Sequence, residues 1–240
     1  MVKVAGELAQ GEKIEKAAGG IAGPLDREHT MLLNSPNISG WIKKPLKKEL
    51  ERALEASVVL ENDSALVGMG EMVYGAGKDF PIAVYLNVGT GVGGARFVNG
   101  RVDVNALGFE PGHQIIDSRG EACPGCNQKG HLEGYVGGAA VEKRFRKKAY
   151  EIDEPEVWDE LAKWLAIGLN NATVHWSPDG IVLGGSMIVG DPAIPIDRIE
   201  SHFAEIMNIF PRPPAIKKAE LKDIGGLYGA LSLVNQSYYV

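Results

Sequence analysis

Leucines spaced four residues apart alternate along the chain with short apolar runs of strand character. From Leu46 to Leu54 this spacing predicts a helix over residues 45–56, with a proline near its start. The β-branched run at residues 57–60 then predicts a strand. The longest amphipathic segment, residues 156–175, predicts a second helix. Helical and strand patterns therefore follow one another along the sequence.

The same patterns predict elements before and after these segments. Further helices are expected over residues 1–15, 64–72, 136–150, 196–210 and 225–234. Further strands are expected over residues 16–22, 82–87, 95–98, 101–104, 181–183 and 221–224. Because strands and helices alternate, the sequence predicts an α/β protein.

The composition is that of a soluble globular chain: 240 residues, 45% of them apolar, with a net charge of -6. The basic run at residues 143–148 is interpreted as a solvated helix face, which argues against a nucleic-acid partner. No apolar run approaches the roughly 18 to 20 residues that span a bilayer, and no secretory signal is recognisable. We therefore expect a cytoplasmic protein with neither a nucleic-acid nor a membrane partner.

Three polar residues occupy positions suited either to a ligand or to local capping. Asn62 and Asp63 follow the strand predicted at residues 57–60, at the edge where α/β sheets bind ligands. A carboxylate there can take a proton from a substrate hydroxyl, but either residue can instead cap the following helix. Asn37 offers an amide that suits sugar hydroxyls or, equally, an Asx turn beside Pro36.

Two glycine-rich turns also follow predicted strands. Residues 89–94 read Gly-Thr-Gly-Val-Gly-Gly and lack the Gly-Lys-Ser/Thr ending of a Walker A loop. Their backbone N–H groups can cradle an anion, although a tight turn into a hairpin explains the glycines as well. The turn at Gly184 and Gly185 can bring a nucleotide close to the backbone or can simply end a strand.

A group of metal-ligand residues lies in one short segment. Its members are His113, Cys123, Cys126 and His131, and both cysteines of the chain are among them. Four nitrogen and sulfur ligands complete a tetrahedral zinc shell, and a closed shell of this kind is structural. A bound metal would hold the flanking carboxylates Glu110 and Glu133 in place. The other interpretation is a pair of reduced surface thiols.

Taken together, seven segments resemble the ROK group of sugar kinases and sugar-responsive regulators. They occur in the family's order at residues 20–26, 36–41, 61–63, 89–94, 110–113, 123–133 and 184–185. The resemblance implies the two-lobed, actin-like ATPase (ribonuclease H-like) fold of sugar kinases, with the substrate in the cleft between the lobes.

The resemblance also implies ATP-dependent phosphorylation of a hexose or N-acetylhexosamine hydroxyl, with Asp63 as the general base. The sugar would be bound by Asn37, Asn62, Asp63, Glu110, His113 and Glu133. The nucleotide would be bound by Gly89, Thr90, Gly91, Gly184 and Gly185, the first three at its phosphates. Kinases of this family use Mg²⁺ with ATP and are commonly dimers, so Mg²⁺, a structural Zn²⁺ and a second copy of the chain are expected.

The ligand segment departs from the family pattern. The family normally supplies one histidine and three cysteines, whereas His131 occupies the place of the third cysteine here. The first two cysteines are separated by two residues rather than one. Histidine also ligates zinc, so we expect the site to persist with an altered affinity.

The N-terminal part also departs from the family pattern. Kinases of the family begin with a strand hairpin carrying Asp-x-Gly-x-Thr, which has no counterpart here, so the N-terminal lobe is expected to be truncated. We expect residues 1–79 with about 225–240 to form this lobe, and residues 80–224 the larger one. The alternative to a kinase is a non-catalytic sugar-binding protein that has lost Mg-ATP binding.

Overall fold

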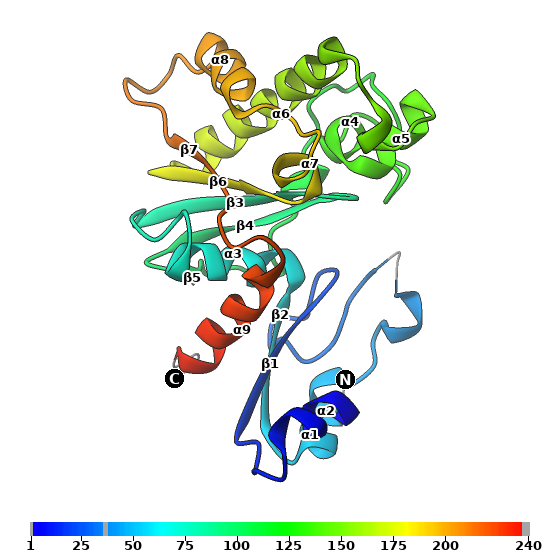
Figure 1. Cartoon of the computed structure of the whole chain (residues 1–240), viewed down its shortest axis with the longest axis vertical. Helices are drawn as coiled ribbons and strands as arrows, with labels where there is room; N and C mark the ends of the chain where they lie inside the picture. Colours follow the sequence, from blue (N-terminus) through cyan, green and yellow to red (C-terminus); the bar gives the residue numbers. More distant parts are fainter. Residues whose placement is uncertain (1, 36–37, 237–240) are drawn as a thin grey trace.

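The structure is a computed structural model that describes residues 2–35 and 38–236. It has two lobes, one built around five strands and the other around two (Figure 1). In the larger lobe the strand order is β5-β4-β3-β6-β7. These strands are β3 (Ile82–Val88), β4 (Val92–Val98), β5 (Arg101–Val102), β6 (Gly180–Gly184) and β7 (Ala215–Lys218).

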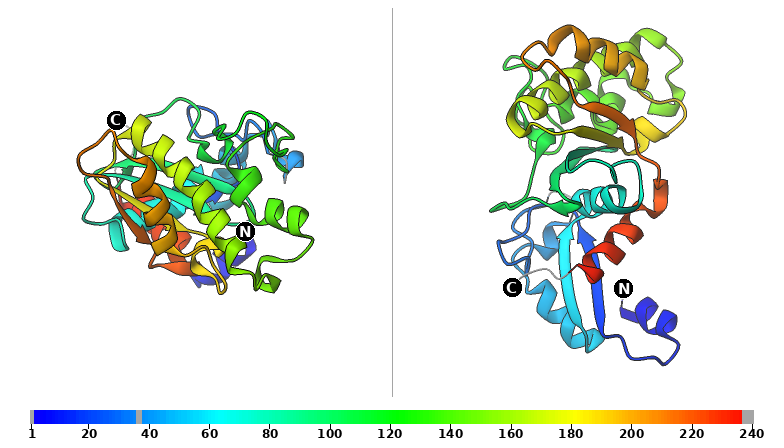
Figure 2. Two further views of the ribbon diagram at one scale, coloured as in Figure 1. Left: turned by 90° about the horizontal axis from the view of Figure 1, so that it is seen from above. Right: turned by 90° about the vertical axis from the view of Figure 1, so that its left-hand side faces the viewer.

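Strand β3 lies at the centre of this sheet. It pairs antiparallel with β4 and parallel with β6. Helices α6 (Pro155–Trp176) and α8 (Ile196–Ile206) cover one face of the sheet, and α3 (Asp63–Tyr74) covers the other (Figure 2). Alternate β3 residues pack into the two layers: Leu86 contacts the α6 core, and Tyr85 contacts the α3 core. The strand is therefore buried on both faces, as sheets between helix layers are.

The smaller lobe contains the first elements of the chain. They are α1 (Val2–Ala9), β1 (Lys16–Ile21), α2 (Leu46–Leu54) and β2 (Ser57–Asn62). Strands β1 and β2 run parallel, so their carboxyl ends point to the same side of the lobe, towards the larger one (Figure 1). A small core under the loop that follows β1 includes Leu25, Leu32 and Leu60.

The last helix of the chain, α9 (Gly225–Asn235), returns to pack against α3 and β1 (Figure 1). The two helices approach so closely that side chains are excluded at the contact. A Cβ atom on Gly70 would lie 2.4 Å from the carbonyl oxygen of Gly225, and one on Gly229 would lie 1.8 Å from that of Leu66. Glycine on both helices therefore permits this packing.

The remaining short elements lie around the larger lobe and in the loops. They are the helices α4 (Glu133–Val136), α5 (Gly138–Phe145) and α7 (Ser186–Val189), with 3-10 turns at Ser39–Trp41, Pro111–His113, Ala149–Glu151 and Lys222–Ile224. Among the described residues, no helix combines the length and apolar character needed to cross a membrane.

Most predicted elements are confirmed. The helix predicted over residues 196–210 ends at Ile206, and the strand predicted over residues 101–104 ends at Val102. Three further predictions are wrong. The first helix ends at Ala9 instead of continuing to residue 15. The helix predicted over residues 136–150 is interrupted because Gly137 is extended and Arg146 is left-handed. Residues 221–224 form no strand, since Lys222 has a φ of 47° that breaks extended pairing.

The predicted division into residues 1–79 with 225–240, and 80–224, stays a prediction. Helix α3 packs against α9 and also contacts β3 and β4 of the larger sheet. Helix α3 therefore packs against elements of both lobes.

Candidate active site

An open cleft of about 730 Å³ lies where the carboxyl ends of β2 and β3 face each other. Most of the predicted site residues line it, coming from five separate segments. They are Asn62, Asp63, Thr90, Gly91, Glu110, His113, Cys126 and Glu133. Residues far apart in the sequence are thus brought to one cavity. Predicted residue Asn37 lies outside the described part of the chain.

Asn62 caps the helix that Asp63 begins, and Asp63 accepts a hydrogen bond from the Ser64 backbone N–H through Oδ1 at 2.8 Å, which leaves Oδ2 for a ligand. The side-chain oxygen of Asn62 accepts hydrogen bonds from the backbone N–H groups of Ser64 (3.0 Å) and Ala65 (3.1 Å). The Asn62 amide also donates to the carbonyl of Gly23 at 3.3 Å. Asn62 is therefore the N-cap of α3, and one N–H of its amide remains for a substrate.

Two further carboxylates face the same cleft. Glu133 accepts a hydrogen bond from the backbone N–H of Val92 at 2.9 Å, which fixes it beside the glycine-rich turn. Burial raises the pKa of Glu110, the nearby His113 lowers it, and the carboxylates of Glu133 and Asp63 raise it again. These mutual influences reflect three acidic groups gathered around one space, suited to accept hydrogen bonds from hydroxyls.

The glycine-rich turn is held against the first turn of α5. The backbone N–H of Gly138 donates to the Gly89 carbonyl at 2.8 Å, and that of Ala139 donates to the Thr90 carbonyl at 3.0 Å. Thr90 and Gly91 line the cleft, whereas Gly89 lies behind them. The turn is therefore a rigid backbone surface open to an anion on its cleft side.

The second glycine turn ends β6 next to the first. Gly185 has a φ of 86°, and a Cβ atom there would lie 2.4 Å from the Val88 carbonyl oxygen. Gly184 and Gly185 do not line the cleft with the carboxylates. Gly184 and Gly185 instead lie beside the first glycine turn, at the end of the neighbouring strand β6.

Because the sequence predicts that Glu133 binds a sugar, Gly91→Ala is expected to raise the KM for that sugar about tenfold by displacing the Glu133 carboxylate. The added Cβ would lie 2.4 Å from Oε2 of Glu133, so the carboxylate has to leave its place beside Val92. Steady-state kinetics over a range of sugar concentrations measures the change. Gly6→Ala is the matched control, because nothing lies within 4 Å of its added Cβ. An unchanged KM in Gly91→Ala contradicts the proposed role of Glu133.

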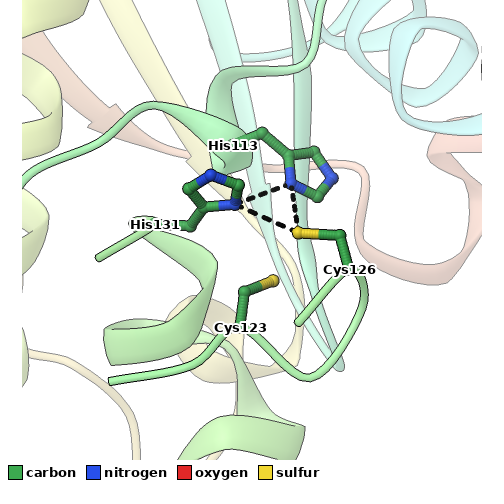
Figure 3. Close-up of side chains that lie close together, drawn as sticks. All are labelled: His113, Cys123, Cys126 and His131. Atoms are coloured by element: carbon green, nitrogen blue, oxygen red, sulfur yellow. Dashed lines mark hydrogen bonds between the residues drawn. The ribbon is translucent and has the colours of Figure 1, made fainter. Parts of the chain in front are cut away.

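The four predicted metal ligands converge on one point (Figure 3). Their ligand atoms all lie within 4.8 Å of one another. Nδ1 of His113 is 3.0 Å from Nδ1 of His131, and Sγ of Cys126 is 3.5 Å and 3.3 Å from these two atoms. Two imidazole nitrogens and a thiol sulfur at such distances suit a shared cation. The donor set of two nitrogens and two sulfurs fits zinc.

The four predicted metal ligands lie next to the carboxylates of the cleft. Sγ of Cys123 donates to Oε1 of Glu133 at 3.1 Å, and burial together with this carboxylate raises the pKa of Cys123 to about 12. Nε2 of His113, the nitrogen that faces away from the cluster, is 4.0 Å from Oε2 of Glu110. The segment that gathers the ligands thus also holds both glutamates.

The sequence analysis missed several residues that line the cleft. They are Asn34, Ser35, Ser64 and Asn87, with the backbone of residues 124–125. Asn87 is the last residue of a predicted strand and Ser64 is the first residue of a predicted helix, and these positions were the signal that could have identified them.

The class is defined by the two lobes and by the cleft between them, which holds three carboxylates and a glycine turn. This is an actin-like ATPase fold, a two-lobed α/β architecture, and solved proteins share it. The ROK hexokinase of Thermus thermophilus superposes with a TM-score of 0.80 and 27% identity, covering 96% of this chain and 83% of that one. A ROK family glucokinase of Streptomyces griseus, solved with glucose and AMPPNP, gives 0.79 and 25% identity, with 97% and 86% covered.

The model of the ROK family matches residues 4–237, and the chain belongs to that family. It is also similar to a glucokinase of Thermotoga maritima, with 33% identity over 147 residues. That alignment covers 60% of this chain and 46% of the relative. The family membership and the fold that the sequence predicted are therefore confirmed.

Proposed function

We propose that this protein is an ATP-dependent sugar kinase that phosphorylates a hydroxyl of a hexose or N-acetylhexosamine. The observation that carries the proposal is the position of Asp63, which lines one cleft with Glu110 and Glu133 and faces the glycine turn. The relatives named glucokinase and hexokinase support the same activity. Glutamates that accept hydrogen bonds orient the sugar, and an aspartate deprotonates one hydroxyl.

The chemistry asks the protein mainly for positioning and charge stabilisation. Asp63 accepts the proton of the attacking hydroxyl, and the hydroxyl oxygen bonds to the terminal phosphorus of ATP. The bond from that phosphorus to the bridging oxygen breaks at the same time, and ADP leaves. Glu110, His113 and Glu133 hold the ring so that one hydroxyl points towards Asp63. The backbone N–H groups of Thr90 and Gly91 would hold the phosphates, and Mg²⁺ bound with ATP would neutralise part of their charge.

A coupled assay for ADP release over a panel of sugars tests the proposal. Sugar-dependent turnover with at least one hexose or N-acetylhexosamine is the expected result, and glucose and N-acetylmannosamine are suitable first members of the panel. No turnover with any member overturns the kinase function. The alternative is a protein that binds the sugar without transferring phosphate. Calorimetric binding of a sugar without turnover identifies that outcome.

A structural zinc ion is part of the proposal. His113, Cys123, Cys126 and His131 would hold it, and it would stiffen the loop that carries the sugar-binding glutamates. We further propose that the protein works as a cytoplasmic homodimer, as the kinases it resembles commonly are. Light scattering on the purified protein measures its oligomeric state.

Elemental analysis is expected to find about one zinc per chain, and clearly less in Cys126→Ser, which lacks one of four ligands. The KM for the sugar is expected to rise in the same variant, because Glu133 follows the ligand His131 by two residues and is placed by the same loop. His175→Asn is the control, since this histidine lies on α6 and bonds only the Asn171 carbonyl. A zinc-free protein that is folded and active contradicts the assignment.

A further inference from the structure

Asn87 is the polar end of an otherwise apolar strand face. Residues at alternate positions of β3 share one face, and on the α3 side Ala83 and Tyr85 are buried in the core. Two residues further along, at the next position on that face, Asn87 is only half-buried and lines the cleft. Its side chain has no hydrogen-bond partner in the part of the chain that the structure describes. An amide presented to a cavity with free donors and a free acceptor is suited to a ligand.

The position of Asn87 lies between the two halves of the site. Its antiparallel partner on β4 is Gly93, and a Cβ atom on Gly93 would lie 2.3 Å from the hydroxyl of Ser64, next to Asp63. Its parallel partner on β6 is Gly184, and Oδ1 of Asn87 is 2.7 Å from the Cβ position of Gly185. The amide thus has the proposed base on one side and the second glycine turn on the other.

A group that moves from a nucleotide at the glycine turns to a hydroxyl at Asp63 therefore passes Asn87. The cleft already holds three carboxylates, Asp63, Glu110 and Glu133, whose charges disfavour an approaching phosphoryl group. A neutral N–H donor offsets part of that repulsion without adding charge. Preorganised donors aimed at the transferring group are a main source of stabilisation in such reactions.

Resting on the proposed kinase function, we infer that Asn87 is a catalytic residue whose amide N–H donates to an oxygen of the phosphoryl group during transfer. The interaction is formed with the moving group, and the sugar hydroxyls are bound elsewhere. Its loss therefore lowers kcat and leaves the affinity for the sugar unchanged.

Kinetics of three variants test the inference. Asn87→Ala is expected to lower kcat about 100-fold, with the sugar KM within about threefold of the wild-type value. Asn87→Ser keeps a shorter donor and recovers part of the loss, whereas Asn87→Asp adds a fourth carboxylate and is the slowest. Asn235→Ala, on the exposed side of α9, is the control. Another rank order, a kcat within about threefold in Asn87→Ala, or an equal loss of sugar binding contradicts the inference.

A binding experiment separates this inference from the proposed function. Fluoroaluminate with Mg-ADP and glucose mimics the phosphoryl group in transit, and calorimetry measures its binding without any turnover. Asn87→Ala is expected to weaken binding of the fluoroaluminate complex about 100-fold and to leave Mg-ADP binding unchanged. This result without sugar-dependent turnover in the wild type keeps the contact between Asn87 and a phosphoryl group, but it overturns the kinase function and with it the catalytic role of Asn87. If the wild type turns over sugar and binds the fluoroaluminate complex no more tightly than Asn87→Ala does, the inference alone is overturned. A wild type that does not bind the fluoroaluminate complex also overturns the inference.

Discussion

Asp63→Asn is expected to lower the turnover number for sugar phosphorylation about 1,000-fold, within the range that a general base contributes. Asparagine has the same shape, and its oxygen can still accept the Ser64 backbone N–H that Asp63 binds at 2.8 Å. It cannot take a proton at neutral pH. The sugar dissociation constant, measured by calorimetry, is expected to stay within about threefold of the wild-type value.

The matched control for this substitution is Asp223→Asn, an exposed aspartate in the 3-10 turn before α9. Its turnover is expected to equal that of the wild type. If Asp63→Asn lost sugar binding as severely as turnover, Asp63 would be a binding residue and not the base. Full activity in Asp63→Asn would remove the residue from the mechanism.

Glu71→Ala is expected to destabilise the protein by about 4 kcal/mol, because it removes a buried acceptor shared by three backbone donors. Glu71 is 1% exposed. One oxygen accepts from Ala76 at 3.0 Å and from Glu220 at 3.2 Å, and the other accepts from Leu221 at 2.8 Å. The carboxylate joins the end of α3 to the segment that leads into α9. For a chain of this size, the midpoint of thermal unfolding should fall by about 10 °C.

Urea unfolding measures the loss, and Glu200→Ala on the exposed side of α8 is the control. Glu71→Gln is expected to lie between the two, because its oxygen can still accept while its NH₂ group faces a donor. A stability loss below about 1 kcal/mol in Glu71→Ala would mean that water replaces the carboxylate at these donors.

The metal cluster could be predicted from sequence because its ligands are neighbours along the chain. Their spacing limits them to one loop, whatever the rest of the protein does. The strand before Asp63 and the glycine turn after β3 were recognisable for a similar reason, since each is a local pattern. The role of each residue in these segments could not be predicted from the neighbouring sequence alone. The choice of Asn62 over Asp63 as the helix cap depends on side-chain geometry that the tripeptide alone does not fix.

Asn87 shows what the sequence could not reveal. Its importance follows from two strand pairings, with Gly93 and with Gly184, and the second of these spans nearly 100 residues. The strand β7 was missed for a related reason: Ala-Ile-Lys-Lys has little strand character alone and pairs because β6 offers an edge. Long-range pairing overrides local preference at such positions.

The contact between α3 and α9 has a consequence for biosynthesis. The 150 residues 75–224 separate the two helices, so at about 5–20 residues per second a ribosome needs about 8–30 s to reach the second helix after the first. During that interval the surface of α3 around Gly70, which later contacts α9, has no partner. The N-terminal lobe is therefore incomplete until α9 has been synthesised. The docking of α9 onto α3 therefore comes late in the biosynthesis of this protein.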